Sequence, residues 1–297
     1  MEKKANQKKY LLRKVTVSPI FLSLALVFKL VFTVYIPLFG LNGMRVGLSG
    51  IFTAFPAILF GPWYGGIISA LSDLLGALIK PSGPFMPAFT VAAFIGGFIK
   101  GLIWRWVKDK NDRALRIVVI VILVIVMALG IYNGIAMKND GVDGSFFDNV
   151  EDASALTFEE YSVPSRIVLE RAAATKDPAS NLPSYITVTT TALWLFGLLA
   201  LLAFVLDFFL SKKIDGMHST FKILISLTLS GLVVSTINTE LLRVLVYSSW
   251  ENVAFFLLWL PRAIEEVLVC TVQAWIVALL YGVYLKQIKP RTFMKDL

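Results

Sequence analysis

The chain has 297 residues, of which 57% are hydrophobic and 16% charged, with a net charge of +8 and a mean hydropathy of +0.75. This composition is typical of a polytopic membrane protein and excludes a large aqueous domain. With one cysteine and one histidine in the whole chain, metal chemistry is poorly supported, and we expect no metal and no cofactor.

Eight apolar stretches are predicted to form an all-α membrane bundle. The first, near 16–37, follows a basic segment but is too long for a signal peptide and has no small-residue cleavage site, so we expect it to stay in the mature protein. The next two, near 46–60 and 63–79, fall short of the roughly 20 residues that cross a bilayer, so we expect them to pack inside the bundle or to thin the bilayer locally. The others lie near 85–107, 117–137, 185–210, 221–248 and 253–285.

Basic residues in alternate loops predict the orientation of the chain. One side, with both termini, holds 18 Lys and Arg residues and the other holds 6, so both termini are predicted to be cytoplasmic. This asymmetry also explains the net charge, which is therefore no evidence for nucleic-acid binding. The longest loop, 139–183, then lies outside and carries nine acidic and three basic residues. We expect a short helix from Pro164 to Ala174 in it, with Pro164 in the first turn, and a mobile chain elsewhere.

Ionisable residues inside predicted spans mark candidate functional positions, because burying charge in a bilayer is costly. Most of them fall in the outer half of the bundle, which predicts a polar cavity opening outward; they are Lys29, Asp73, Glu240, Arg243, Arg262, Glu265 and Glu266. Lys100 and Asp207 fall near the inner ends, where we expect their side chains to reach the cytoplasmic interface. Near the level of the cavity lie Asn42, Arg45, Asn238, Trp250 and Trp259. Such a mixture suits a planar heterocycle with an acidic tail.

Structural roles are open for the same residues. Glu240 with Arg243, and Arg262 with Glu266, have helical spacings at which they could neutralise each other. Asp73 could equally bond to a neighbouring helix, and Lys29 could pair with a nearby carboxylate. The two tryptophans could be ordinary interfacial residues.

The string LFGPWYGGIISALSDLLGALIKPSGPFMPAFT, together with INTELLR and WLPRAIEEV, is similar to the folate-type substrate-binding (S) components of energy-coupling-factor (ECF) vitamin transporters. The resemblance covers roughly residues 15–110 and 219–286. It implies a six-helix S-component-like core with two inserted transmembrane helices. The predicted parts are therefore 1–110 with the first four helices, an inserted helix pair over 111–218 with the acidic loop, and 219–297 with the last two core helices.

The resemblance also implies site residues. Arg45, Asn238 and Arg262 match positions that face the vitamin pocket, and Asp73 joins them because of its buried charge. Phe85 and Phe89, with Pro84 and Pro87, match the loop that shapes the pocket mouth. Docking on a coupling subunit is expected on small residues of the first three helices, although the family's paired alanines are missing; the candidates are Ser23, Ala25, Gly65, Gly66, Ser69 and Ala70.

The function implied by the resemblance is capture of a vitamin, with folate or a reduced folate as the expected ligand, outside a prokaryotic plasma membrane. No G-x-x-x-x-G-K-[ST] loop occurs, so a transmembrane coupling subunit and two ATPase subunits would supply the energy. Three alternatives remain: an S component for another micronutrient, a self-sufficient secondary transporter, and an intramembrane serine protease. The protease is disfavoured because Ser49 of the string GLSG and the single histidine, His218, are predicted on opposite sides of the membrane. We therefore expect no enzyme activity.

Overall fold

The computed structural model describes residues 2–38, 41–81, 85–150, 153, 156–175, 177–213, 220–250 and 254–285. Within these ranges, the side chains of 2–13, 36–38, 41–45, 210–213 and 249 are not described. The predicted membrane helix bundle is confirmed: seven helical segments among the described residues are long and apolar enough to cross a bilayer. The contacts divide the chain into two compact units, one of 1–112, 205–241 and 265–297, and one of 113–204 and 242–264.

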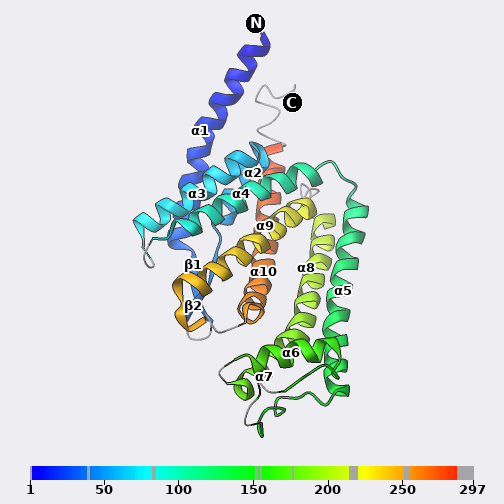
Figure 1. Cartoon of the computed structure of the whole chain (residues 1–297). Coiled ribbons are helices and arrows are strands. Elements are labelled where there is room, and N and C mark those ends of the chain that lie inside the picture. The colour runs from blue at the N-terminus through cyan, green and yellow to red at the C-terminus, as the bar shows by residue number, and fades with distance from the viewer. Residues whose placement is uncertain are drawn as a thin grey trace. The chain divides into compact units, whose positions relative to one another are not determined.

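The first helix, α1 (Glu2–Val31), ends six residues before the predicted boundary. An antiparallel hairpin follows, of β1 (Thr33–Leu38) and β2 (Leu41–Gly47), with Thr33 opposite Gly47 and Leu38 opposite Leu41 (Figure 1). The prediction that the helix continues to residue 37 and that the fold is purely helical is therefore wrong at this point. The run Thr-Val-Tyr-Ile consists of β-branched and aromatic residues that favour a strand. The register is irregular between Ile36 and Leu38, on either side of a proline that has no N–H to donate.

Three helices of the first unit follow the hairpin: α2 (Gly50–Leu59), α3 (Pro62–Ile79) and α4 (Pro87–Val107). With 10 residues α2 is too short to cross a bilayer, as predicted, whereas α3 has 18 residues and qualifies as a span. Between α2 and α3, Gly61 has φ of 101°, a left-handed conformation that favours glycine. The crossing of α3 and α4 is close because Gly65 and Gly97 meet there, and a Cβ on either would collide with the other's backbone.

The second unit contains α5 (Asp112–Asn139, from Arg113 onward), α6 (Val163–Ala173), α7 (Pro178–Thr187), a π-helical turn (Val188–Ala192) and most of α8 (Leu193–Lys213). Gly130 of α5 packs against Trp194, and Gly197 of α8 packs against Met127. In the π turn the backbone hydrogen bonds span one residue more than in an α-helix. Nδ2 of Asn133 donates to the carbonyl of Thr189 in this turn at 3.0 Å.

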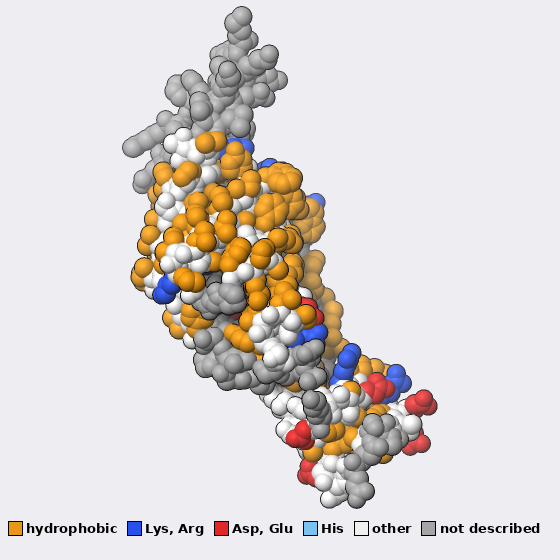
Figure 2. All heavy atoms as spheres, turned by 60° about the vertical axis from the view of Figure 1, so that its left-hand side comes forward, with side chains coloured by type: hydrophobic (Ala, Val, Ile, Leu, Met, Phe, Trp, Pro, Cys, Tyr) orange, Lys and Arg blue, Asp and Glu red, His pale blue; other side chains and the backbone are white. Residues whose placement is uncertain are grey.

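The predicted helix at 164–174 is confirmed by α6, with Pro164 in its first turn. The expectation of a mobile remainder is not met, because the loop has an apolar core of its own. Its buried members are Met137, Val142, Phe147, Ala153, Phe158, Val168, Leu169, Ala172, Leu182 and Tyr185, joined by Leu257. In Figure 2 apolar side chains cover most of the face shown, and most acidic side chains in view gather at the level of α6 and α7.

The chain returns to the first unit with α9 (Thr220–Leu241), which packs on α4, and with the second part of α10 (Phe255–Val283). Lys222, near the start of α9, donates to the carbonyl of Lys108 at 2.8 Å and pairs with Asp112 at 2.9 Å. The start of α9 is therefore tied to the end of α4 and the start of α5. Between α9 and α10 lie a π turn (Leu242–Val246) and a short 3-10 turn (Ser248–Trp250).

Candidate functional site

The first unit encloses a polar cavity of about 220 Å³. Its walls come from α1, β2, the start of α2, and α3, α4, α9 and α10. Glycine, serine and threonine supply much of the lining, and five ionisable side chains other than Cys270 face it: Lys29, Asp73, Lys100, Glu265 and Glu266. The predicted polar cavity thus exists among the buried charges, with a partly different set of residues around it.

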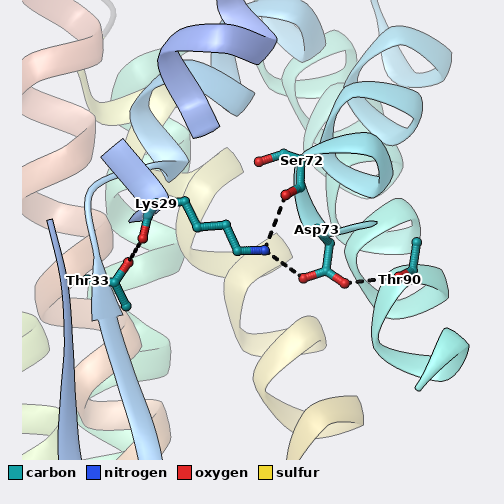
Figure 3. A network of polar contacts seen from close by, with 5 residues as sticks. All are labelled: Lys29, Thr33, Ser72, Asp73 and Thr90. Carbon is teal, nitrogen blue, oxygen red and sulfur yellow. Dashed lines mark hydrogen bonds and ion pairs between the residues drawn. The ribbon is translucent and has the colours of Figure 1, made fainter. Parts of the chain in front are cut away.

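One wall of the cavity is a network centred on Asp73 (Figure 3). Nζ of Lys29 on α1 pairs with Oδ1 of Asp73 on α3 at 2.8 Å and also donates to the carbonyl of Ser72 at 3.3 Å. Thr90 of α4 donates to the other carboxylate oxygen of Asp73 at 3.0 Å. The Lys29 stem has room because Gly76 lies opposite: a Cβ there would be 3.0 Å from its last atoms. The Asp73 carboxylate therefore joins α1, α3 and α4. Bonding to neighbouring helices is the structural role that the sequence left open for Asp73.

A second polar cluster in the cavity joins α4, α9 and α10. Sγ of Cys270 donates to Oε1 of Glu266 at 3.2 Å, and the Glu266 carboxylate interacts electrostatically with the Lys100 ammonium. Gly231 of α9 leaves the space for this carboxylate, since a Cβ there would collide with it. The prediction that Lys100 reaches the cytoplasmic interface is wrong, because its side chain lines the cavity. The same prediction is wrong for Asp207, which is fully buried.

The amide of Gln273 was missed from the sequence. Its Nε2 donates to the carbonyl of Gly47 at the end of β2, at 2.9 Å, and the side chain lies against Gly50, where a Cβ would collide with it. The hairpin is thereby fixed to the middle of α10. The available signal was an uncharged amide in an apolar helix, but only charged residues inside the predicted spans were taken to mark functional positions.

Of the six predicted substrate-binding residues, Asp73 alone lines this cavity among the described side chains. Asn238 lies farther along α9, and its buried Oδ1 has no hydrogen-bond partner among the described residues. Phe85 is exposed and Phe89 is half-buried, and neither faces the cavity. Arg262 belongs to the part of α10 that is grouped with the second unit. The side chain of Arg45 lies outside the described residues, although its backbone pairs with Tyr35 in the hairpin.

Three of the six residues predicted for docking are buried inside the first unit: Ala25, Gly65 and Gly66. Gly65 packs against Gly97 of α4 and Ala57 of α2, and Gly66 packs against Phe94 of α4. Ala25 is fully buried, and Ser69 faces the cavity. Ala70 is half-buried, and the hydroxyl of exposed Ser23 donates to the carbonyl of Pro19 at 2.9 Å. Internal packing accounts for most of these small residues, and their docking role stays a prediction.

Three other candidates are placed as follows. Trp250 is buried, with its ring 4.6 Å from that of Tyr247, and Trp259 stacks on Phe256 at 5.8 Å. Ser49 precedes α2 and lines the cavity, whereas His218 lies outside the described residues.

Comparison with known proteins points to vitamin transporters of the ECF class. Residues 12–140, fewer than half of the chain, match the family model described as the S component of the ECF-type riboflavin transporter. The folate transporter FolT of Clostridium novyi (strain NT) is 37% identical over 82 residues, which are 28% of this chain and 48% of that protein. The chain thus spans about half the length of this curated relative in the match. No solved structure matches. Both similarities confirm the resemblance to ECF S components, and with the apolar helices they indicate a multi-pass membrane protein of a transport family.

Proposed function

We propose that this chain is the substrate-capture component of an ECF-type importer and that the cavity of the first unit receives a vitamin, folate or a reduced folate. The observation that carries the proposal is a helix bundle with cations, carboxylates and hydroxyls gathered around one cavity, in the part of the chain that resembles S components. Intramembrane charges facing a common cavity are typical of substrate sites in transporters.

The size of the cavity also bears on the ligand. Its volume of about 220 Å³ lies below the 300–1,000 Å³ usual for drug-sized ligands. A folate would therefore place its ring system in this cavity and extend its acidic tail beyond it. Arg45, Asn238 and Arg262 remain proposed vitamin contacts.

The energy for transport would come from a coupling subunit and two ATPase subunits in a prokaryotic plasma membrane. Both termini are proposed to be cytoplasmic. Because the seven long helices among the described residues would by themselves put the termini on opposite sides, this orientation requires one further crossing. A self-sufficient carrier is the second candidate, favoured by the charges in the core of the bundle. Uptake of labelled folate by cells that express this chain with and without the coupling subunit separates the two, because the ECF proposal requires that subunit.

The substrate itself is tested by calorimetry on the purified chain in nanodiscs, with folate, a reduced folate, riboflavin, thiamine, biotin and pantothenate. We expect one-to-one binding of a folate. Binding of riboflavin instead would keep the class and replace the ligand. Absence of binding to every vitamin would overturn the proposed function.

A further inference from the structure

Lys100 of α4 and Glu266 of α10 are oppositely charged side chains of the cavity. Neither is among the vitamin contacts proposed above. Both side chains line the cavity, and they interact electrostatically with each other. Gly231 provides the space that lets the carboxylate lie against α9, and Cys270, one turn further along α10, donates to Oε1. The packing of three helices thus holds the Glu266 carboxylate in place beside the Lys100 ammonium.

Both members of this pair have unused hydrogen-bonding capacity. A carboxylate accepts about four hydrogen bonds, and among the described residues Glu266 has one, from Cys270, and no ion pair. An ammonium donates three, and within the same part of the chain Lys100 has no recorded hydrogen bond or ion pair. By contrast, Lys29 and Asp73 in the same cavity satisfy each other at 2.8 Å. Charges left partly unpaired in a bundle core are costly, so a ligand that bonds to both would relieve that cost.

We infer that Glu266 and Lys100 recognise the polar edge of a 2-amino-4-oxopteridine ring, an inference that rests on the proposed function. That edge presents two neighbouring N–H donors, at N3 and at the 2-amino group, followed by the carbonyl at C4. The two oxygens of Glu266 accept the two N–H groups in parallel, as they would from an arginine fork. The Lys100 ammonium donates to the C4 carbonyl. One acidic and one basic side chain on adjacent helices therefore match the whole edge.

The same arrangement rejects an imide edge, such as that of a flavin. There the sequence is carbonyl, N–H, carbonyl, so the second oxygen of Glu266 faces a carbonyl oxygen instead of a donor. Two acceptors in contact leave both unsatisfied and repel each other, and this is a source of large discrimination between ligands of equal size. The pair thus distinguishes folates from flavins, the two ligands that the similar proteins' descriptions name.

The test uses two bicyclic rings that differ at position 2 and at the adjoining N1: pterin, with the 2-amino group and an acceptor N1, and lumazine, its 2,4-dione, in which N1 carries a hydrogen. On the wild-type chain in nanodiscs we expect calorimetry to show pterin binding at least tenfold tighter than lumazine. Glutamine has one acceptor and one donor, which fits the imide edge. Glu266→Gln should therefore weaken pterin, strengthen lumazine and reverse the preference.

Glu170→Gln is the matched control, since it makes the same change at an acid of α6 that is 56% exposed and does not line the cavity. We expect it to leave the pterin-to-lumazine ratio within about threefold of the wild type. If the wild type binds folate but does not prefer pterin over lumazine, the inference is overturned while the proposed function stands. This comparison uses the wild type alone, so it does not depend on whether a variant folds. A folded Glu266→Gln protein that keeps the wild-type ratio also overturns it. If the wild type binds no folate at all, the proposed function fails first.

Discussion

At the scale of single residues, the Lys29–Asp73 pair is the clearest structural element of the cavity. The two side chains are 13% and 18% exposed and lie 2.8 Å apart. Removing one partner of a buried pair leaves an uncompensated charge, which costs on the order of 3 kcal/mol. We expect Asp73→Leu and Lys29→Met each to lower the unfolding temperature clearly. The double variant Lys29→Met/Asp73→Leu should be more stable than either single variant would suggest, because no charge is then left alone.

Thermal unfolding of the four proteins in detergent measures this coupling. Simply additive losses would show that the two side chains do not stabilise each other. The same proteins test whether Asp73 contacts the vitamin: if its role is structural, the double variant binds folate with wild-type affinity, whereas a direct contact predicts weaker binding in a well-folded double variant.

Depth in the membrane was enough to predict a polar cavity, but not its lining. Counting residues to the helix end placed Lys100 near the cytoplasm, whereas its side chain lines the cavity, beside which Gly96 packs on Val234 of α9 and Gly231 packs on Glu266 of α10. Such packing depends on which helices are neighbours, and a single sequence does not give that. Gln273 was missed for a related reason: an amide has no charge to mark it.

At the scale of elements, the hairpin was missed because its residues satisfy two patterns. A short apolar run that continues a predicted span cannot be told from a strand by periodicity alone. By contrast, the helix at α6 was predicted well, since a proline in the first turn is a strong start signal.

The start of α6 supports a prediction about pH. Oδ2 of Asp140, just after α5, accepts hydrogen bonds from the N–H and the hydroxyl of Ser162, the N-cap residue of α6. Chiefly the hydroxyl bond from Ser162, with a further contribution from Ser165, holds the pKa of Asp140 below its usual value. Because the folded pKa is the lower one, this stabilisation is present above about pH 4 and is lost as the pH falls through the folded pKa.

Hydrogen exchange of residues 162–174, corrected for the intrinsic rate, measures this effect. We expect the wild type to lose protection of α6 between pH 6 and pH 3, and Asp140→Asn to show weaker protection that changes less with pH. Asp143→Asn is the control, because that carboxylate accepts its bonds from Ser145 within its own loop. The idea is refuted if Asp140→Asn and the wild type lose α6 protection in parallel.

At the scale of the whole molecule, the cavity draws on both ends of the chain and not on the middle. Its lining comes from residues 29–100 and 227–273, and α4 packs directly on α9. The chain between them, which the sequence suggested is an insertion, has its own apolar core. The resemblance to S components suggested the division, because the matching strings stop before this segment and resume after it, and the insertion stays a prediction. The apolar core was not predicted, because the acidic composition of the segment is typical of a mobile loop.

Two hypotheses for the inserted segment follow: a lid that shapes the vitamin site, or a separate module. Leu182 is fully buried in the core of the segment, and Leu182→Ala should destabilise that core by about 2–5 kcal/mol. Since no described residue of 113–204 lines the cavity, we expect faster proteolysis between residues 142 and 185 but an unchanged dissociation constant for folate. The matched change in the first unit is Leu227→Ala, at a residue that is almost as buried and lines the cavity, and it should weaken binding. A weaker affinity in Leu182→Ala would instead show that folate binding depends on the packing of the inserted core, because destabilising a module separate from the site should leave the affinity unchanged.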